Sequence, residues 1–120
     1  MTRGQLEAEI SRLIVQFAKE QLGRGPERVR TRVVEDVVFV RMAGALTRAE
    51  KHLATQADGA RLVKEMRLRL MESSRDTLEA VIAGPTGCQL VSLHTDLSTR
   101  TGEEVLLFVL DCNLEKSLEP

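Results

Sequence analysis

The chain has 120 residues, of which 42% are hydrophobic and 29% charged, and its formal net charge is −1. These values are typical of one globular domain, so we expect a single domain over residues 1–120. No apolar run approaches the roughly 20 residues of a membrane span, and the polar N-terminus is unlike a signal peptide, so a cytoplasmic location without membrane insertion is expected. The lack of a basic excess, and of Trp and Tyr, argues against nucleic-acid binding.

The first predicted element is an amphipathic helix from Gln5 to Leu22. Apolar residues recur along it every three or four positions, which is the spacing of one helical face. Gly23 follows where a left-handed C-cap is expected, and Pro26 prevents the helix from continuing. The apolar face consists of Leu6, Ile10, Leu13, Ile14 and Phe17.

Two strands are predicted within residues 28–43. In the first strand valines and a threonine alternate with arginines, and an apolar run forms the second. The dipeptide Glu35-Asp36 between them is interpreted as a short turn, although it is not a favoured hairpin sequence.

Two helices are predicted to follow. The residues Thr47-Arg-Ala-Glu50 have the spacing of a capping box, which marks a helix start. This first helix is short, with Leu53 facing inward, and Asp58-Gly59 interrupts it. A longer helix then extends to Ala83 and is stopped by Gly84-Pro85. Its expected inward residues are Val63, Met66, Leu70, Leu78, Val81 and Ile82.

The last third predicts a hairpin from Cys88 to Cys112 with its loop at Ser98–Gly102, followed by a frayed end over residues 113–120. The order of elements is therefore α-β-β-α-α-β-β. Paired antiparallel hairpins with segregated helices form a two-layer α+β domain. We expect a four-stranded antiparallel sheet with its helices mainly on one face.

The final strand is apolar on both of its faces. Helices on one face of an antiparallel sheet normally leave the other face polar, so a second copy of the domain is expected to cover the remaining apolar face. We predict a homo-oligomer, with a dimer favoured; the alternative is that the long helix buries this face within one chain. The residues assigned to the contact are Leu106, Phe108 and Leu110.

His94 and Asp96 lie two residues apart on a strand and therefore share a face. With a third ligand they could hold a metal, and with a water they could form an acid–base pair. The structural alternative is that Asp96 shapes the loop through backbone amides while His94 is half-buried. No metal-ligand spacing or catalytic motif supports a reaction, so we expect no enzyme activity, metal or cofactor.

The two cysteines, Cys88 and Cys112, would lie opposite each other in this hairpin. A cross-strand pair could approach disulfide or metal-ligand distance. Two small buried thiols are the favoured interpretation, because disulfides are uncommon in cytosolic proteins.

An arginine cluster suggests a second kind of site. If the first hairpin has a two-residue turn, Arg30 lies opposite Arg41 and Arg32 opposite Phe39, so guanidinium groups gather on one face. Such a face suits a small anion or nucleotide, with His94, Asp96 and Arg100 near the pocket; the alternative is a solvated edge strand. The clustered residues are Arg24, Arg28, Arg30, Arg32 and Arg41.

Four segments together resemble the MpsC-like family, a small bacterial family of unknown function named after a component of a membrane-potential-generating, or bicarbonate-uptake, system. The residues that carry the resemblance are Phe17-Ala-Lys-Glu-Gln-Leu-Gly-Arg-Gly-Pro26, Val29-Arg-Thr, Gly44-Ala-Leu-Thr-Arg-Ala-Glu50 and Ser92-Leu-His-Thr-Asp-Leu-Ser-Thr-Arg-Thr-Gly-Glu103. Proline often occupies the place of Arg48 in the family. The resemblance implies a small bacterial domain associated with ion or bicarbonate transport, and it supplies no catalytic residues.

Three functions are therefore carried forward. The leading hypothesis is a non-enzymatic accessory or regulatory domain that oligomerises through its sheet and contacts a partner such as a membrane-transport protein. The second is a sensor of small anions or nucleotides that uses the arginine cluster. The third is an enzyme that uses His94 and Asp96.

Overall fold

The computed structural model describes all 120 residues as an α+β domain in the predicted order, with the predicted long helix divided in two and a short 3₁₀ turn added at the end. Its four strands form one antiparallel sheet with the spatial order β1-β2-β4-β3. The two hairpins therefore meet through β2 and β4. The elements are α1 (Arg3–Leu22), β1 (Arg28–Val34), β2 (Val37–Ala43), α2 (Arg48–Leu53), α3 (Ala57–Ser73), α4 (Arg75–Thr86), β3 (Leu90–Leu97), β4 (Glu104–Leu110) and η1 (Leu114–Lys116).

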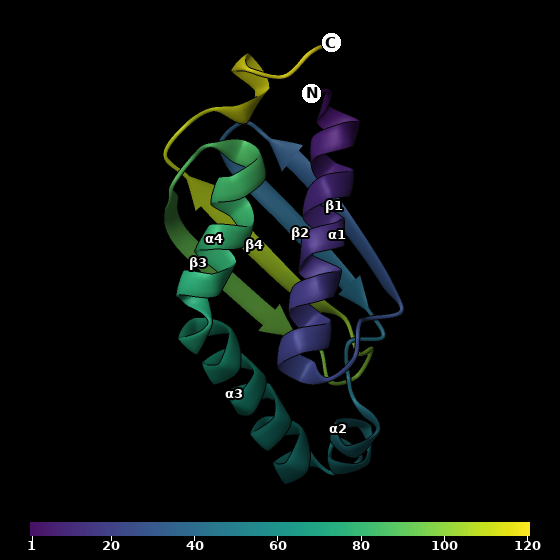
Figure 1. Ribbon diagram of the computed structural model, residues 1–120. Helices are drawn as coiled ribbons and strands as arrows, with labels where there is room; N and C mark the ends of the chain where they lie inside the picture. Colours follow the sequence, from purple (N-terminus) through teal and green to yellow (C-terminus); the bar gives the residue numbers. More distant parts are fainter.

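Helices α1 and α4 lie across one face of the sheet, and α3 continues from α4 past the end of the sheet toward α2 (Figure 1). The core forms between these two helices and the sheet, where Ile10, Ile14, Leu78, Ile82 and Phe108 are fully buried. None of the helices combines the length and the apolar character needed to cross a membrane. The α2–α3 arm gives the molecule its elongated shape, with extents of 47 × 24 × 22 Å.

Local signals set the ends of the first helix and the register of the first hairpin. A capping box between Thr2 and Gln5 starts α1, and Gly23 ends it with a φ of 79°, as a left-handed C-cap requires. The turn between β1 and β2 has two residues, and Glu35 adopts a φ of 55° within it. Arg30 consequently lies opposite Arg41, which confirms the predicted register.

The long helix predicted to run to Ala83 is instead two helices. The chain leaves helical geometry at Ser74, where φ is −93° and ψ is 11°. This break lets α4 lie on the sheet while α3 passes its end (Figure 1). The Gly84-Pro85 pair does not stop α4 but sits in its last turn, and Gly87 forms the C-cap with a φ of 70°.

The buried stripe of α3 is narrower than predicted. Val63, Arg67 and Met71 are its buried positions, each four residues from the next. Met66 was predicted to face inward but is 43% exposed, and Leu53 of α2 is 46% exposed for the same reason: the arm extends beyond the sheet that would cover these side chains.

The residues after the last strand are ordered rather than frayed. The amide of Leu114 donates a hydrogen bond to the Glu35 carbonyl at 2.9 Å, and its side chain is only 2% exposed. Thr2 and Glu119 form an isolated bridge that brings the two chain ends together. The C-terminal segment thus closes one end of the core.

Candidate functional site: the open face of the sheet

The strand β4 places its predicted interface residues inside the domain. Leu106, Phe108 and Leu110 are 0%, 0% and 3% exposed because they point toward α1 and α4. The structure therefore corrects the assignment of these three residues to a subunit contact. Because side chains alternate along a strand, the face without helices carries Val105, Leu107 and Val109 instead.

The middle of this open face is apolar. The pairing registers place Val37 beside Val109 and Phe39 beside Leu107, with Val105 next along β4. All five side chains are partly exposed, and no element of the chain covers them. An antiparallel sheet with helices on one side normally presents polar residues on the other, so this surface is unusual for an isolated domain.

Arginines occupy the β1 side of the open face. Arg28, Arg30 and Arg32 alternate along β1, and Arg41 of β2 lies directly opposite Arg30. Arg41 pairs with Glu103 at 2.8 Å. Neither Arg28 nor Arg30 has an acidic partner within the chain, and together with Arg41, Ala43 and Glu103 they line an open hollow of about 30 Å³.

The polar side of the open face lies on β3. His94 sits beside Leu107 and Asp96 beside Val105, so the two share a face as predicted, and both are exposed. One oxygen of Asp96, Oδ1, accepts from the Leu97 amide at 2.9 Å and lies 3.2 Å from Lys64 Nζ. These contacts, Lys64 first and then the amide, hold the pKa of Asp96 below its usual value.

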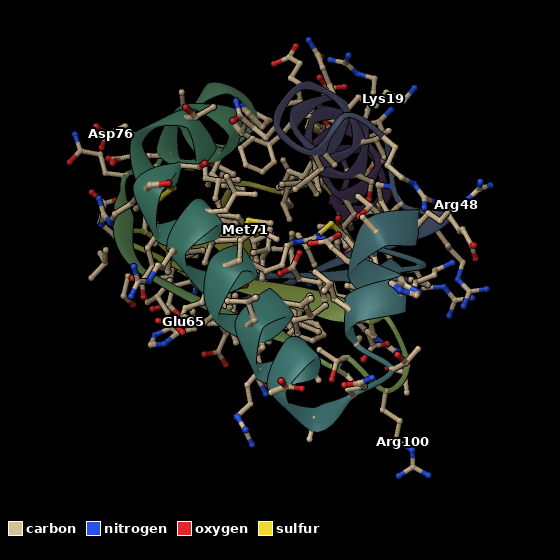
Figure 2. All side chains as sticks on the ribbon, turned by 90° about the horizontal axis from the view of Figure 1, so that it is seen from below. Lys19, Arg48, Glu65, Met71, Asp76 and Arg100 are labelled. Atoms are coloured by element: carbon tan, nitrogen blue, oxygen red, sulfur yellow. A yellow bond between two sulfur atoms is a disulfide. The ribbon has the colours of Figure 1, made fainter.

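Two predicted site residues lie away from the open face. Arg24 donates to the carbonyl oxygens of Leu46 and Gly44, at 2.9 and 3.5 Å, and so holds the segment between β2 and α2. Arg100 borders a different hollow, of about 380 Å³, between α2 and the β3–β4 loop, and its side chain extends away from the body of the molecule (Figure 2). The seven predicted ligand residues therefore do not form one site. They lie on the β1 side of the open face, on β3, in the β3–β4 loop and beside the segment between β2 and α2.

Sequence reasoning missed a buried ion cluster made of Arg67, Glu50 and Glu104. The Arg67 guanidinium donates to Glu50 Oε1 at 2.9 Å and to Glu104 Oε1 at 2.6 Å, and also to the Ala45 carbonyl at 2.9 Å. Arg67 is fully buried, and Glu104 is 1% exposed. The cluster joins α2 and α3 to the start of β4.

One guanidinium group, that of Arg67, serves two carboxyl groups in this cluster. Burial raises the pKa of Glu104 above its usual value; Arg67 opposes the shift, and Glu50 and Asp96 add to it. A sequence signal existed: Arg67 lies four residues from both Val63 and Met71, and Glu104 has the same parity as the inward side chains of β4.

Cys88 and Cys112 are joined by a disulfide with their Cα atoms 5.9 Å apart. This corrects the favoured interpretation of two separate buried thiols, although the predicted cross-strand proximity is confirmed. The bond links the start of β3 to the end of β4. Asp111 lies close by, with ligand atoms of all three residues within 4.8 Å, and its Oδ1 accepts from the Gln89 amide at 2.9 Å.

A second apolar surface lies on the α2–α3 arm. Leu62 and Met66 lie one turn apart on α3 and are 58% and 43% exposed, and Leu53 of α2 lies beside Leu62. Met71, farther along α3, points into the interior, whereas Glu65 points outward (Figure 2). The arm therefore provides a control surface against which the open face can be tested.

Comparison with known proteins agrees with the predicted resemblance. The family model described as "Na+-translocating membrane potential-generating system (MpsC)" matches residues 2–112. "Uncharacterized protein YbcI" of Bacillus subtilis (strain 168) is 42% identical over 118 residues, which cover 98% of this chain and 95% of that protein. "Uncharacterized protein YrhF" of the same organism is 29% identical over 113 residues, with 92% of each chain covered. No solved structure matches.

Proposed function

We propose that this chain, which belongs to the MpsC family, is a non-enzymatic accessory or regulatory domain that works by contact and associates with a second copy through the open face of its sheet. The observation that carries the proposal is the apolar middle of that face, centred on Phe39 and Leu107, which nothing in the chain covers. Contiguous exposed apolar surface on a small domain is characteristic of an interaction site.

The size of the face indicates how strong such a contact is. Four strands about 4.8 Å apart and seven residues long give a footprint of roughly 19 × 23 Å. A contact of this size lies toward the small end of protein interfaces, so we expect the association to depend on concentration. A reversible contact of this kind suits a regulatory domain, which must exchange partners.

The family description supports the setting of the proposal. It names a Na⁺-translocating, membrane-potential-generating system, and we infer that the domain acts in the cytoplasm beside a component of such a system. Its proposed role is that of a contact partner, and the uncovered open face supports this role.

Self-association can be measured by sedimentation over a range of concentrations from about 10 to 500 µM. The chain mass is 13.4 kDa, and we expect a concentration-dependent rise toward twice that value. Leu107→Thr preserves strand propensity while removing apolar surface, and it is expected to weaken the dimer about tenfold. The matched control, Leu62→Gln on the α2–α3 arm, is expected to leave the dimer unchanged.

Circular dichroism of each variant confirms that it is folded. A wild-type chain that stays monomeric throughout the range contradicts the proposal. Loss of the dimer in Leu62→Gln alone also contradicts it, because the contact would then lie on the arm.

A second candidate function, small-anion sensing, rests on the hollow beside Arg28, Arg30 and Arg41. Three guanidinium groups there share one carboxylate, Glu103, so a bound anion would relieve their repulsion. Phosphate and bicarbonate, titrated at constant ionic strength, should raise the melting temperature of the wild type and not of Arg30→Gln. Equal responses of the two proteins would exclude this site.

A further inference from the structure

The open face is divided into three bands that run along the strands. The basic band on β1 consists of Arg28, Arg30 and Arg32. The apolar band on β2 and β4 consists of Val37, Phe39, Val105, Leu107 and Val109, and Arg41 of β2 lies beside its Val105 end. The polar band on β3 consists of Ser92, His94 and Asp96. The face is therefore asymmetric from one edge of the sheet to the other.

We propose that the second copy packs on this face about a two-fold axis parallel to the strands, so that the basic band of each copy lies over the polar band of the other and Arg30 meets Asp96. The inference rests on the proposed self-association and adds its geometry. The contact is isologous, so the Arg30–Asp96 pair forms twice in each dimer.

The alignment of residues across the two facing sheets supports this axis. The axis exchanges β2 with β4 of the partner copy and keeps each residue at the same height along the strands. Phe39 then lies over Leu107 and Val37 over Val109, so these apolar side chains cover one another, while Arg41 lies over Val105. Packed sheets align within about 30° of each other, a rotation that moves the edge strands by about one residue and that long arginine side chains can accommodate.

The other two-fold axis in the plane of the sheet runs across the strands and brings like charges together. It places the basic band of one copy over the basic band of the other, with Arg32 near Arg30. Like charges brought together at an interface oppose association, so this arrangement is disfavoured.

Arg30 is free for the proposed ion pair, and Asp96 would share the pair with Lys64 of its own chain. Arg30 is exposed and has no acidic partner within its own chain. Asp96 uses Oδ1 for Lys64 and the Leu97 amide, while Oδ2 makes no hydrogen bond within the chain. Packed sheets lie about 10 Å apart, a gap that an extended arginine and an aspartate can bridge from opposite sides.

A charge-swap cycle tests the axis. Dissociation constants are measured by sedimentation for the wild type, Arg30→Glu, Asp96→Arg and the double variant. Each single change is expected to weaken the dimer about tenfold by opposing like charges, and the double variant is expected to recover most of the loss. Arg61→Glu on α3 carries the same charge change away from the face and is expected to have no effect.

The outcomes separate the geometry from the proposed function. If Arg30→Glu tightens the dimer, the basic bands face each other and the proposed axis is wrong although self-association stands. If the double variant is no stronger than the single variants, the pair does not form and the axis is likewise overturned. A wild type without self-association overturns both proposals.

Discussion

Replacing Arg67 with methionine removes the cation from the buried ion cluster while keeping a long side chain in its place. Glu50 and Glu104 then lose their counter-ion, and the Ala45 carbonyl loses its donor. Removing one partner of a buried ion pair costs about 3–5 kcal/mol. A chain of this size has a free energy of unfolding of roughly 6–18 kcal/mol, so the variant is expected to remain folded but to lose a large part of its stability.

The loss depends on pH in a definite direction. Without Arg67, burial favours the protonated form of Glu104 even more than it does in the wild type, where its pKa is already raised. The folded state then binds more protons than the unfolded state, so stability falls as pH rises above the usual carboxyl pKa. The deficit of the variant is therefore greatest at neutral pH and shrinks as pH falls toward about 4.5, near the reference value of a free glutamate.

Urea denaturation followed by circular dichroism at pH 5.0 and pH 7.5 measures both effects. The matched control is Arg69→Met on the same helix, where Arg69 pairs with Glu65 at 2.7 Å but is exposed, and where the loss should stay below about 1 kcal/mol. Equal losses in the two variants at pH 7.5 would refute the reasoning. So would a deficit of Arg67→Met that grows as pH falls.

Two further substitutions test local features of the fold. Gly44→Ala is expected to cost about 1–2 kcal/mol in a thermal or urea melt, because Gly44 has a φ of 62° and a Cβ there would run into the side chain of Glu27; an unchanged melt would show that the turn relaxes freely. Cys88→Ser is expected to cost about 3 kcal/mol, because the bond to Cys112 closes a 24-residue separation, and a reductant should lower the wild-type melting temperature to match. A reductant without effect would mean that the pair is not oxidised, the state expected in the cytosol.

Signals between residues close together in the sequence predicted much of this fold. The register of β1 and β2 follows from the number of residues in the Glu35-Asp36 turn, and pairing Arg30 with Arg41 needed no tertiary information. The capping box between Thr47 and Glu50 is also present, with hydrogen bonds of 2.8 and 3.2 Å. Such features depend on nearest neighbours, so the sequence contains all that determines them.

The sequence pattern could not predict which face of β4 the helices cover. Both faces are apolar, so the pattern of alternation carried no sign of the answer, and Leu107 and Phe108 were equally plausible in the core. Glu104 shares a face of β4 with Phe108, and a carboxylate on that face suggests that the face is exposed to solvent. The structure instead buries Glu104 against Arg67, a partner 37 residues away along the chain.

The break at Ser74 has a similar origin. No glycine or proline marks it, and the apolar spacing continues through it toward Leu78. The sheet supplies the reason, because α4 must lie on the core while α3 must carry Arg67 to the end of β4. Long-range pairing of this kind overrides the local preference for one continuous helix.

The distribution of charge also bears on how far association can proceed. The open face carries four arginines (Arg28, Arg30, Arg32, Arg41) and two carboxylates (Asp96, Glu103), a sum of +2, so the rest of a chain whose net charge is −1 carries −3. If the basic face met the acidic remainder of another copy, the contact would be heterologous and each complex would keep a free face for the next. Pairing two open faces about the proposed axis leaves none. The apolar band distinguishes these arrangements, because the two-fold contact covers it in both copies; the proposed axis therefore predicts an association that stops at two.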